Sequence, residues 1–188
     1  MLEKFWARRA NRYLMAVLGA SVLAAGGDSE KTGDNLQVAL PAVALACSVA
    51  NGEAVSYLVR FAAVQAVVHT SKAGLEGNWI NQRPSGSPGG FPSGHTSAAA
   101  FGASSLVYSC ARVNPFVSGL AVIGAGTVGV SRIEAGAHFL YQVVAGAFLG
   151  WAGERATFLA RLLSLWWRLR SRRPFRLGLT GGGISRAG

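Results

Sequence analysis

The stretch from Arg83 to His138 contains three short polar motifs within a sequence that is otherwise almost entirely apolar or small. These motifs are Arg83-Pro84, Phe91-Pro92-Ser93-Gly94-His95-Thr96, and Ser131-Arg132 followed after five intervening residues by His138. Charged and ionisable side chains are costly in so apolar a chain, so their presence calls for a functional reason.

The composition favours a helical membrane protein over a soluble domain. Of the 188 residues, 51% are hydrophobic and only 14% are charged, and the mean hydropathy is +0.32. Soluble domains carry about 25% charged residues. The net charge of +10 is concentrated at the two ends, without interleaved aromatic and basic residues in the middle. This placement argues against nucleic-acid binding and favours contact with an anionic lipid surface.

Six apolar runs predict an all-α fold, a six-transmembrane-helix bundle of an integral membrane protein. The runs are Tyr13–Gly27, Leu36–Ala50, Ala54 to about Thr70, Ser93–Cys110, Phe116–Val130 and His138 to about Leu165. Most hold about 15 to 19 uncharged residues, and roughly 20 span a bilayer, so hydropathy alone leaves buried helices of a soluble protein open. Polar loops are expected over Asp28–Asn35 and Lys72–Gly90.

The runs predict a single membrane domain over residues 1–176, with an active-site segment at 72–142 and a disordered tail over 177–188. The first run also fits a signal peptide, because basic residues precede it and Ala24-Ala25-Gly26 lies near its end. We expect it to remain as an uncleaved span.

The distribution of basic residues predicts the orientation of the six spans. Both termini lie on the side that carries most of the positive charge, including the Arg168–Arg176 cluster. The positive-inside rule therefore places both termini in the cytoplasm and both histidine motifs on the opposite side. We expect a bacterial inner-membrane protein with its active site facing the periplasm.

The motif residues suit the binding and attack of a phosphate. Arg83 and Arg132 can each pair with phosphate oxygens through the planar guanidinium fork. Ser93-Gly94 lies where a loop becomes a helix, so its backbone N–H groups can face an anion. Each residue also has an ordinary structural explanation, as an interface anchor or a helix cap. Their occurrence on one predicted membrane side favours a shared phosphate site.

The histidines suggest two chemical roles. His95 lies in the first turn of the fourth predicted helix and could donate a proton to a leaving oxygen. His138 could act as the nucleophile and form a phosphohistidine. His69 belongs to no motif, and we expect it to make a packing or interface contact.

Together these motifs resemble the three-part signature of the type 2 phosphatidic acid phosphatase superfamily. The resemblance covers about 55 residues directly, and the six-span plan extends it to most of the chain. It implies a membrane phosphatase that needs neither metal nor cofactor, with His138 attacking phosphorus and His95 protonating the leaving group. It also implies phosphate binding by Arg83, Ser93, Gly94 and Arg132.

The first motif departs from the family pattern. The family places a lysine seven residues before the arginine, where this chain has Glu76. Lys72 lies eleven residues before Arg83, and both spacings return to nearly the same helix face. Lys72 is therefore a candidate phosphate ligand, with a solvated loop charge as the alternative.

The third motif departs at Gln142, where the family usually has aspartate. Residues i and i+4 share a helix face, so this side chain can reach His138. The Gln142 carbonyl can accept the hydrogen bond of an aspartate, but it carries no charge. The dolichyl-diphosphate phosphatase branch is similar in carrying glutamine here. Gln142 is thus a candidate catalytic residue and favours a lipid diphosphate.

We expect hydrolysis of a lipid phosphate or diphosphate on the non-cytoplasmic face. Candidate substrates are polyprenyl diphosphate, phosphatidylglycerophosphate, phosphatidic acid and a lipid A type lipid. A lipid phosphotransferase using the same histidines, or a catalytically weak lipid-phosphate-binding membrane protein, remains an alternative. Cys47 and Cys110 each lie in an apolar run, and we expect two free, buried thiols.

Overall fold

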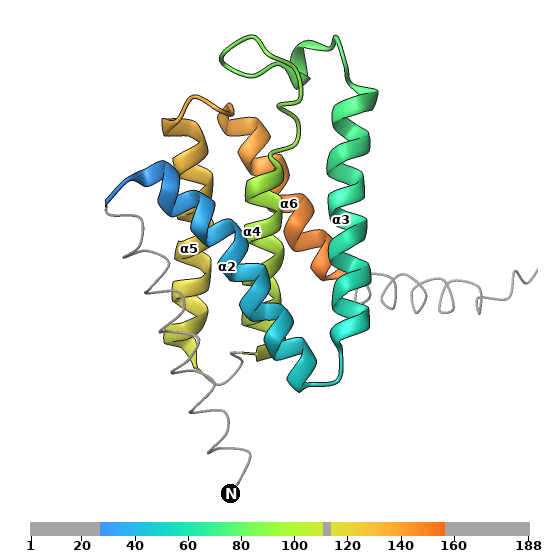
Figure 1. Cartoon of the computed structure of the whole chain (residues 1–188), viewed down its shortest axis with the longest axis vertical. Coiled ribbons are helices and arrows are strands. Elements are labelled where there is room, and N and C mark those ends of the chain that lie inside the picture. The colour runs from blue at the N-terminus through green and yellow to red at the C-terminus, as the bar shows by residue number, and fades with distance from the viewer. Residues whose placement is uncertain (1–26, 111–113, 157–188) are drawn as a thin grey trace, which may run out of the picture. The chain divides into compact units, whose positions relative to one another are not determined.

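The computed structural model describes residues 27–110 and 114–156 (Figure 1). These residues are helical throughout, without a strand, and belong to one compact unit that ends at Ala156. The elements are α2 (Ser29–Ala50), α3 (Ala54–Gly74), the short 3₁₀ helix η1 (Trp79–Asn81), α4 (Gly94–Ser105), the π-helical turn η2 (Leu106–Cys110), α5 (Pro115–Glu134) and α6 (Leu140–Glu154). The predicted all-α class is confirmed for this part of the chain.

The helix boundaries correct the expected loops. Residues Asp28–Asn35 do not form the predicted loop, because α2 begins at Ser29. The Asp28 side chain caps this helix by accepting hydrogen bonds from the backbone N–H groups of Glu30 and Lys31. Helix α3 continues to Gly74, so Lys72 lies in its last turn rather than in a loop.

Other boundaries follow the prediction more closely. Ser93–Cys110 corresponds to α4 and η2, and α5 extends the fifth run to Glu134. The last helix begins at Leu140, so His138 precedes it instead of opening it. The first run, the end of the sixth, the proposed boundary at residue 176 and the tail over 177–188 lie outside the described residues, apart from Gly27.

The apolar exterior supports association with a membrane. Two helices, α2 and α5, are long and apolar enough to cross a bilayer by length and composition. Large apolar side chains also face outward, including Val55 at 76% exposure and Ile123 at 66%. The described residues supply five α-helices, so the six-helix bundle stays a prediction.

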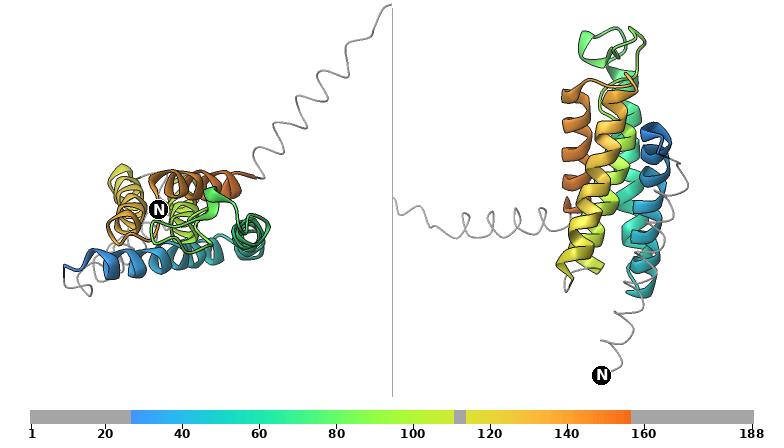
Figure 2. Two further views of the ribbon diagram at one scale, coloured as in Figure 1. Left: turned by 90° about the horizontal axis from the view of Figure 1, so that it is seen from above. Right: turned by 90° about the vertical axis from the view of Figure 1, so that its left-hand side faces the viewer.

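Helix α4 occupies the centre of the arrangement. It packs against α2, α3, α5 and α6, and ten of its twelve residues are buried (Figures 1 and 2). Glycine allows this close approach. A Cβ atom at Gly102 would lie 2.5 Å from the Pro41 backbone nitrogen, and one at Gly150 would meet the Ser97 carbonyl and lie 2.8 Å from the Phe101 nitrogen. The backbone of α4 is therefore in direct contact with the backbones of α2 and α6.

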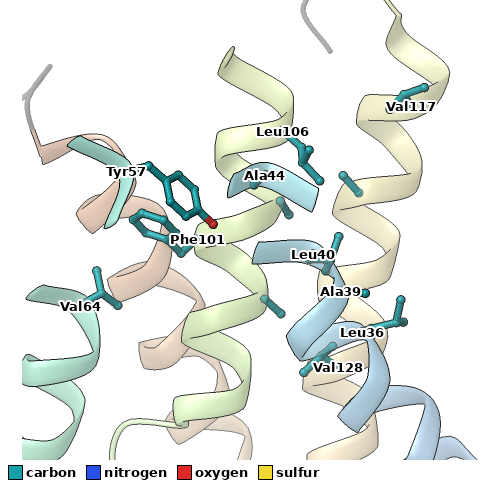
Figure 3. Close-up of a cluster of buried hydrophobic side chains, with 13 residues drawn as sticks. Leu36, Ala39, Leu40, Ala44, Tyr57, Val64, Phe101, Leu106, Val117 and Val128 are labelled. Atoms are coloured by element: carbon teal, nitrogen blue, oxygen red, sulfur yellow. The ribbon is translucent and has the colours of Figure 1, made fainter. Parts of the chain in front are cut away.

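A cluster of apolar side chains fills the space between α2, α3, α4 and α5 (Figure 3). Tyr57 and Phe101 are both fully buried, and their rings meet edge to face at 5.1 Å between centroids. The Tyr57 hydroxyl donates to the Pro41 carbonyl at 2.7 Å, so its one polar atom is satisfied within the core.

A disulfide joins Cys47 near the end of α2 to Cys110 at the end of η2, with 6.2 Å between the Cα atoms. The expectation of two free thiols is therefore wrong. Helices α2 and α4 run in the same direction, which brings their later ends together across 63 residues of sequence. Neither cysteine's local sequence reports this contact.

Candidate active site

The three motifs meet at one end of the bundle. Figure 1 shows the 75–93 segment and the 135–139 connection together above the start of α4. The last turn of α3 and the last turn of α5 reach the same end, bringing Lys72 and Arg132. This end of the bundle is called the motif end below.

Ser93 forms the start of α4. Its hydroxyl accepts a hydrogen bond from the Thr96 backbone N–H at 3.4 Å, which is the geometry of an N-cap. The Ser93 backbone N–H donates to the backbone carbonyl of Gln142 at 3.0 Å. This bond joins the second motif to the third, and the structural role considered for Ser93 is present alongside its candidate binding role.

His138 and Gln142 form a buried pair. His138 is 4% exposed, Gln142 is 0% exposed, and His138 Nδ1 lies 3.2 Å from Gln142 Oε1. The Gln142 amide nitrogen donates to the carbonyl oxygens of Ile80 at 3.1 Å and Gln82 at 2.7 Å. These two carbonyls fix the amide orientation, so Oε1 must face the imidazole.

This orientation determines the histidine tautomer. Because Oε1 accepts only, His138 Nδ1 carries the proton and donates it. The Nε2 atom then holds the free lone pair. Burial, aided by the positive charges of Arg83 and Lys72, lowers the pKa of His138 to about 4 against the opposing hydrogen bond with Gln142. The imidazole is therefore neutral near pH 7, as a nucleophile requires.

The main chain ties His138 to Arg132. The backbone N–H groups of Ala137 and His138 both donate to the Arg132 carbonyl, at 3.0 and 3.1 Å. The five intervening residues of the third motif thus close a turn between the arginine and the histidine. The arginine side chain is 6% exposed, although it lies at a helix end.

Helix α2 supplies the partners of the Arg132 guanidinium. Its Nη2 donates to the Glu30 carbonyl at 3.0 Å, and its Nη1 lies 3.1 Å from Asp34 Oδ1. The same Asp34 oxygen lies 3.5 Å from His95 Nε2. Sequence reasoning missed Asp34, because it belongs to no motif and falls in the expected loop. The only available signal was an acidic residue on the predicted side of the arginines.

Arg83 and Lys72 complete the cationic surroundings. The Arg83 Nη2 reaches the Gly89 carbonyl at 3.4 Å, whereas its buried Nε has no hydrogen-bond partner among the described residues. The Lys72 amino group lies 3.8 Å from the position of a Cβ atom at Gly94. The structure thus places all eight predicted site residues at the motif end; their roles stay predictions.

Asn81 is a second residue that sequence reasoning missed. It is 1% exposed, its side-chain nitrogen donates to the Lys72 carbonyl at 2.9 Å, and its side-chain oxygen accepts from the Phe91 N–H at 3.0 Å. Its backbone carbonyl accepts from the Gly90 N–H at 2.7 Å. Asn81 therefore holds the first motif, the second motif and the end of α3 together.

A cavity of about 620 Å³ lies between α2, α3 and α4 and reaches the motif end. Lys72 and His95 line it there, and apolar side chains such as Leu45, Leu58 and Phe61 line most of the remainder. His69 also lies on its wall and is exposed, and the packing or interface contact expected for it stays a prediction. A charged head region joined to an apolar cavity matches an amphiphile with a phosphate group.

Residues 27–110 and 114–156 contain no group of three or more His, Cys, Asp or Glu side chains that could hold a metal ion. The polar residues gathered at the motif end include the cations Lys72, Arg83 and Arg132, the histidines His95 and His138, the Gln142 amide and the carboxylate of Asp34 that contacts Arg132 and His95. A buried neutral imidazole near the positive charges of Arg83 and Lys72 is consistent with the predicted phosphate site.

The PAP2 superfamily profile matches residues 53–173, which is most of the chain. The chain therefore belongs to the PAP2 superfamily, the type 2 phosphatidic acid phosphatases, as its motifs suggested. Membership supports phosphatase-type activity on phosphate esters. No curated protein and no solved structure shows a significant match.

Proposed function

We propose that this protein hydrolyses a membrane lipid phosphate or diphosphate through a phosphohistidine on His138. The observation that carries this proposal is the Gln142-fixed tautomer of His138, which leaves a neutral Nε2 under the positive charges of Arg83 and Lys72. Neither a structural ion pair nor a simple lipid-binding site needs a buried imidazole held in this form.

The reaction follows from these groups. The phosphate binds between Arg132 and Arg83, with Lys72 and the Ser93-Gly94 backbone adding positive potential. The His138 Nε2 lone pair attacks phosphorus, and the bond from phosphorus to the leaving oxygen breaks. His95 gives its proton to that oxygen. Water then attacks the phosphohistidine, the P–N bond breaks and inorganic phosphate leaves.

The apolar cavity supports a lipid as the substrate. Its lining residues on α2 and α3 would contact the hydrocarbon chain while the phosphate lies at the motif end. Gln142 is a neutral partner for His138, and the dolichyl-diphosphate phosphatase branch is similar in carrying glutamine at this position. We therefore favour a polyprenyl diphosphate. Phosphatidylglycerophosphate, phosphatidic acid and a lipid A type lipid remain the comparison substrates.

The decisive experiment measures phosphate release by the purified full chain in detergent, across this panel of lipids, with excess EDTA. We expect EDTA-resistant release that His138→Ala lowers by at least about 10³-fold. A parallel reaction with ³²P-labelled lipid, quenched rapidly, should label the parent and leave His138→Ala unlabelled. Glu76→Gln serves as the control, because Glu76 is exposed and the substitution removes one negative charge on the same side of the bundle.

The outcomes separate the competing functions. Transfer of the label to another lipid, without free phosphate, would identify a phosphotransferase. Lipid binding that survives His138→Ala, with no turnover in the parent, would identify a binding protein and overturn the proposal.

We also propose that the protein spans the bacterial inner membrane, with both termini in the cytoplasm and the site facing the periplasm. The charge distribution supports this orientation. The Cys47–Cys110 disulfide counts against it, because it lies at the bundle end away from the site and disulfides persist mainly in oxidising compartments. Reporter fusions to the C-terminus decide the matter. A cytoplasm-dependent fluorescent reporter should be active there, and a periplasm-dependent phosphatase reporter should be inactive.

A further inference from the structure

The motif end contains a carboxylate that the proposed chemistry does not use. Asp34 lies on α2, before the residue at which the family match begins. A single oxygen, Oδ1, lies 3.1 Å from Arg132 Nη1 and 3.5 Å from His95 Nε2. The two groups that it contacts are a phosphate-binding residue and the proton donor of the proposed reaction.

Asp34 Oδ1 contacts the same two groups that the oxygens of the substrate must contact in the proposed reaction. In the proposed reaction an oxygen on phosphorus must contact Arg132, and the leaving oxygen must be within reach of His95. Asp34 presents one anionic oxygen to both groups at once. A phosphate and the Asp34 carboxylate therefore compete for the same guanidinium edge, because like charges in one position repel.

Asp34 is able to leave this position without disturbing Arg132. The Asp34 side chain is 48% exposed, whereas the Arg132 side chain is 6% exposed. Arg132 keeps two other hydrogen bonds, to the Glu30 carbonyl at 3.0 Å and to the Ser131 hydroxyl at 3.3 Å. The arginine is thus held in place whether or not the carboxylate is bound to it.

Close packing keeps Asp34 near the site. A Cβ atom at Gly33 would meet the Ser131 side chain and lie 3.2 Å from Arg132 Nη2, so α2 rests directly on the third motif. Asp34 is one residue further along this helix. Its carboxylate is therefore supplied at high local concentration whenever the phosphate departs.

We propose that Asp34 is an internal competitor for the phosphate site. Its carboxylate contacts Arg132 and His95 when no substrate is bound, and the phosphate of the substrate displaces it. The inference rests on the proposed function, because it assigns Asp34 to the same site. It predicts that removing the carboxylate strengthens phosphate binding, whereas removing a structural or catalytic residue weakens binding or turnover.

The test is titration of inorganic phosphate into the full chain in detergent, by calorimetry, for the parent, Asp34→Asn and Asp34→Ser. Each variant should bind phosphate about three- to tenfold more tightly, since partly exposed ion pairs make modest contributions. The KM for the lipid should fall by a similar factor while kcat stays within about twofold. Glu76→Gln, which removes an exposed charge, should leave the Kd of phosphate unchanged.

Unchanged or weaker phosphate binding in both Asp34 variants would overturn the inference, as would a fall in kcat with KM unchanged. Arg132→Ala tests the proposed function separately. If the parent binds phosphate and Arg132→Ala does not, the phosphate site stands whatever the Asp34 variants show. If the parent neither binds nor releases phosphate, the proposed function itself fails. Thermal unfolding of each variant checks that its fold is intact.

Discussion

The two ends of α4 are both buried, but different interactions hold them in place. At its start, Ser93 and its neighbours are fixed by hydrogen bonds between polar atoms of α4, α6 and the preceding loop. Toward its other end, Phe101 and the following Leu106 lie in the apolar cluster (Figure 3). Cys110 of the Cys47–Cys110 disulfide packs against the same cluster. Hydrogen bonds depend on direction, whereas apolar burial depends mainly on area. Substitutions at the motif end should therefore change the rate, and those at the other end the stability.

The largest effect should come from Phe101→Ala. Phe101 is fully buried and contacts the rings of Tyr57 and Phe61, so its removal leaves a cavity at the core. Such substitutions reduce the free energy of unfolding by about 3–5 kcal/mol. Thermal unfolding in detergent measures this loss. Phosphate release per folded molecule should stay near the parent value. A large loss of rate in the folded fraction would show that the two ends are not separable.

A smaller effect, mainly on the rate of phosphate release, should come from Gln142→Glu. A carboxylate cannot donate to the carbonyls of Ile80 and Gln82, so the loop before Arg83 loosens. We expect kcat/KM per folded molecule to fall about 10- to 100-fold at neutral pH, with a loss of about 1–3 kcal/mol in the free energy of unfolding from the carbonyls left without a donor. Gln82→Ala is the control, because it keeps the backbone carbonyl that accepts the bond.

The same variant should shift the pH dependence. In the parent, burial holds the pKa of His138 to about 4, so its imidazole stays neutral and reactive down to that range. A glutamate beside Nδ1 favours the imidazolium and raises this pKa. The nucleophile is then lost at a higher pH, and the acid limb of kcat/KM against pH should move upward. If the acid limb of this profile does not move, the ionisation of His138 does not determine the loss of kcat/KM at low pH.

The smallest effect should come from Tyr57→Phe. This change removes only the hydrogen bond from the Tyr57 hydroxyl to the Pro41 carbonyl and leaves the ring contact with Phe101. We expect a loss of about 1 kcal/mol in the free energy of unfolding and no change in kcat. Comparison with Phe101→Ala then separates the polar from the apolar contribution at this end. A change in kcat larger than the change in stability would contradict the division.

The sequence predicted the helices and the joining of the motifs well, because apolar runs and the order of spans determine both. It failed where a feature depends on one helix contacting another. The start of α2 looked like a loop, since seven mostly polar residues follow Asp28, yet that aspartate caps a helix there. The disulfide was missed because it depends on the parallel arrangement of α2 and α4.

The candidate site divides in the same way. His138 and Gln142 are four residues apart, so the sequence spacing predicted their contact, although His138 lies just before the start of α6 and not within the helix. The contacts of Gln142 with Ile80 and Gln82 span about sixty residues of sequence, and no local pattern reports them. Asp34 and Asn81 were missed for this reason: their partners lie on other elements.

The turn between Arg132 and His138 has a consequence for how such a protein could diversify. The Arg132 carbonyl and the N–H groups of Ala137 and His138 set the spacing of the proposed phosphate-binding and attacking residues within one short piece of chain. The residues along the apolar cavity lie mostly on other helices, α2 and α3. Under the proposed function, mutations there would change which lipid is accepted while the spacing of Arg132 and His138 is inherited intact. Lengthening or shortening the turn would alter both functions of the third motif in a single step.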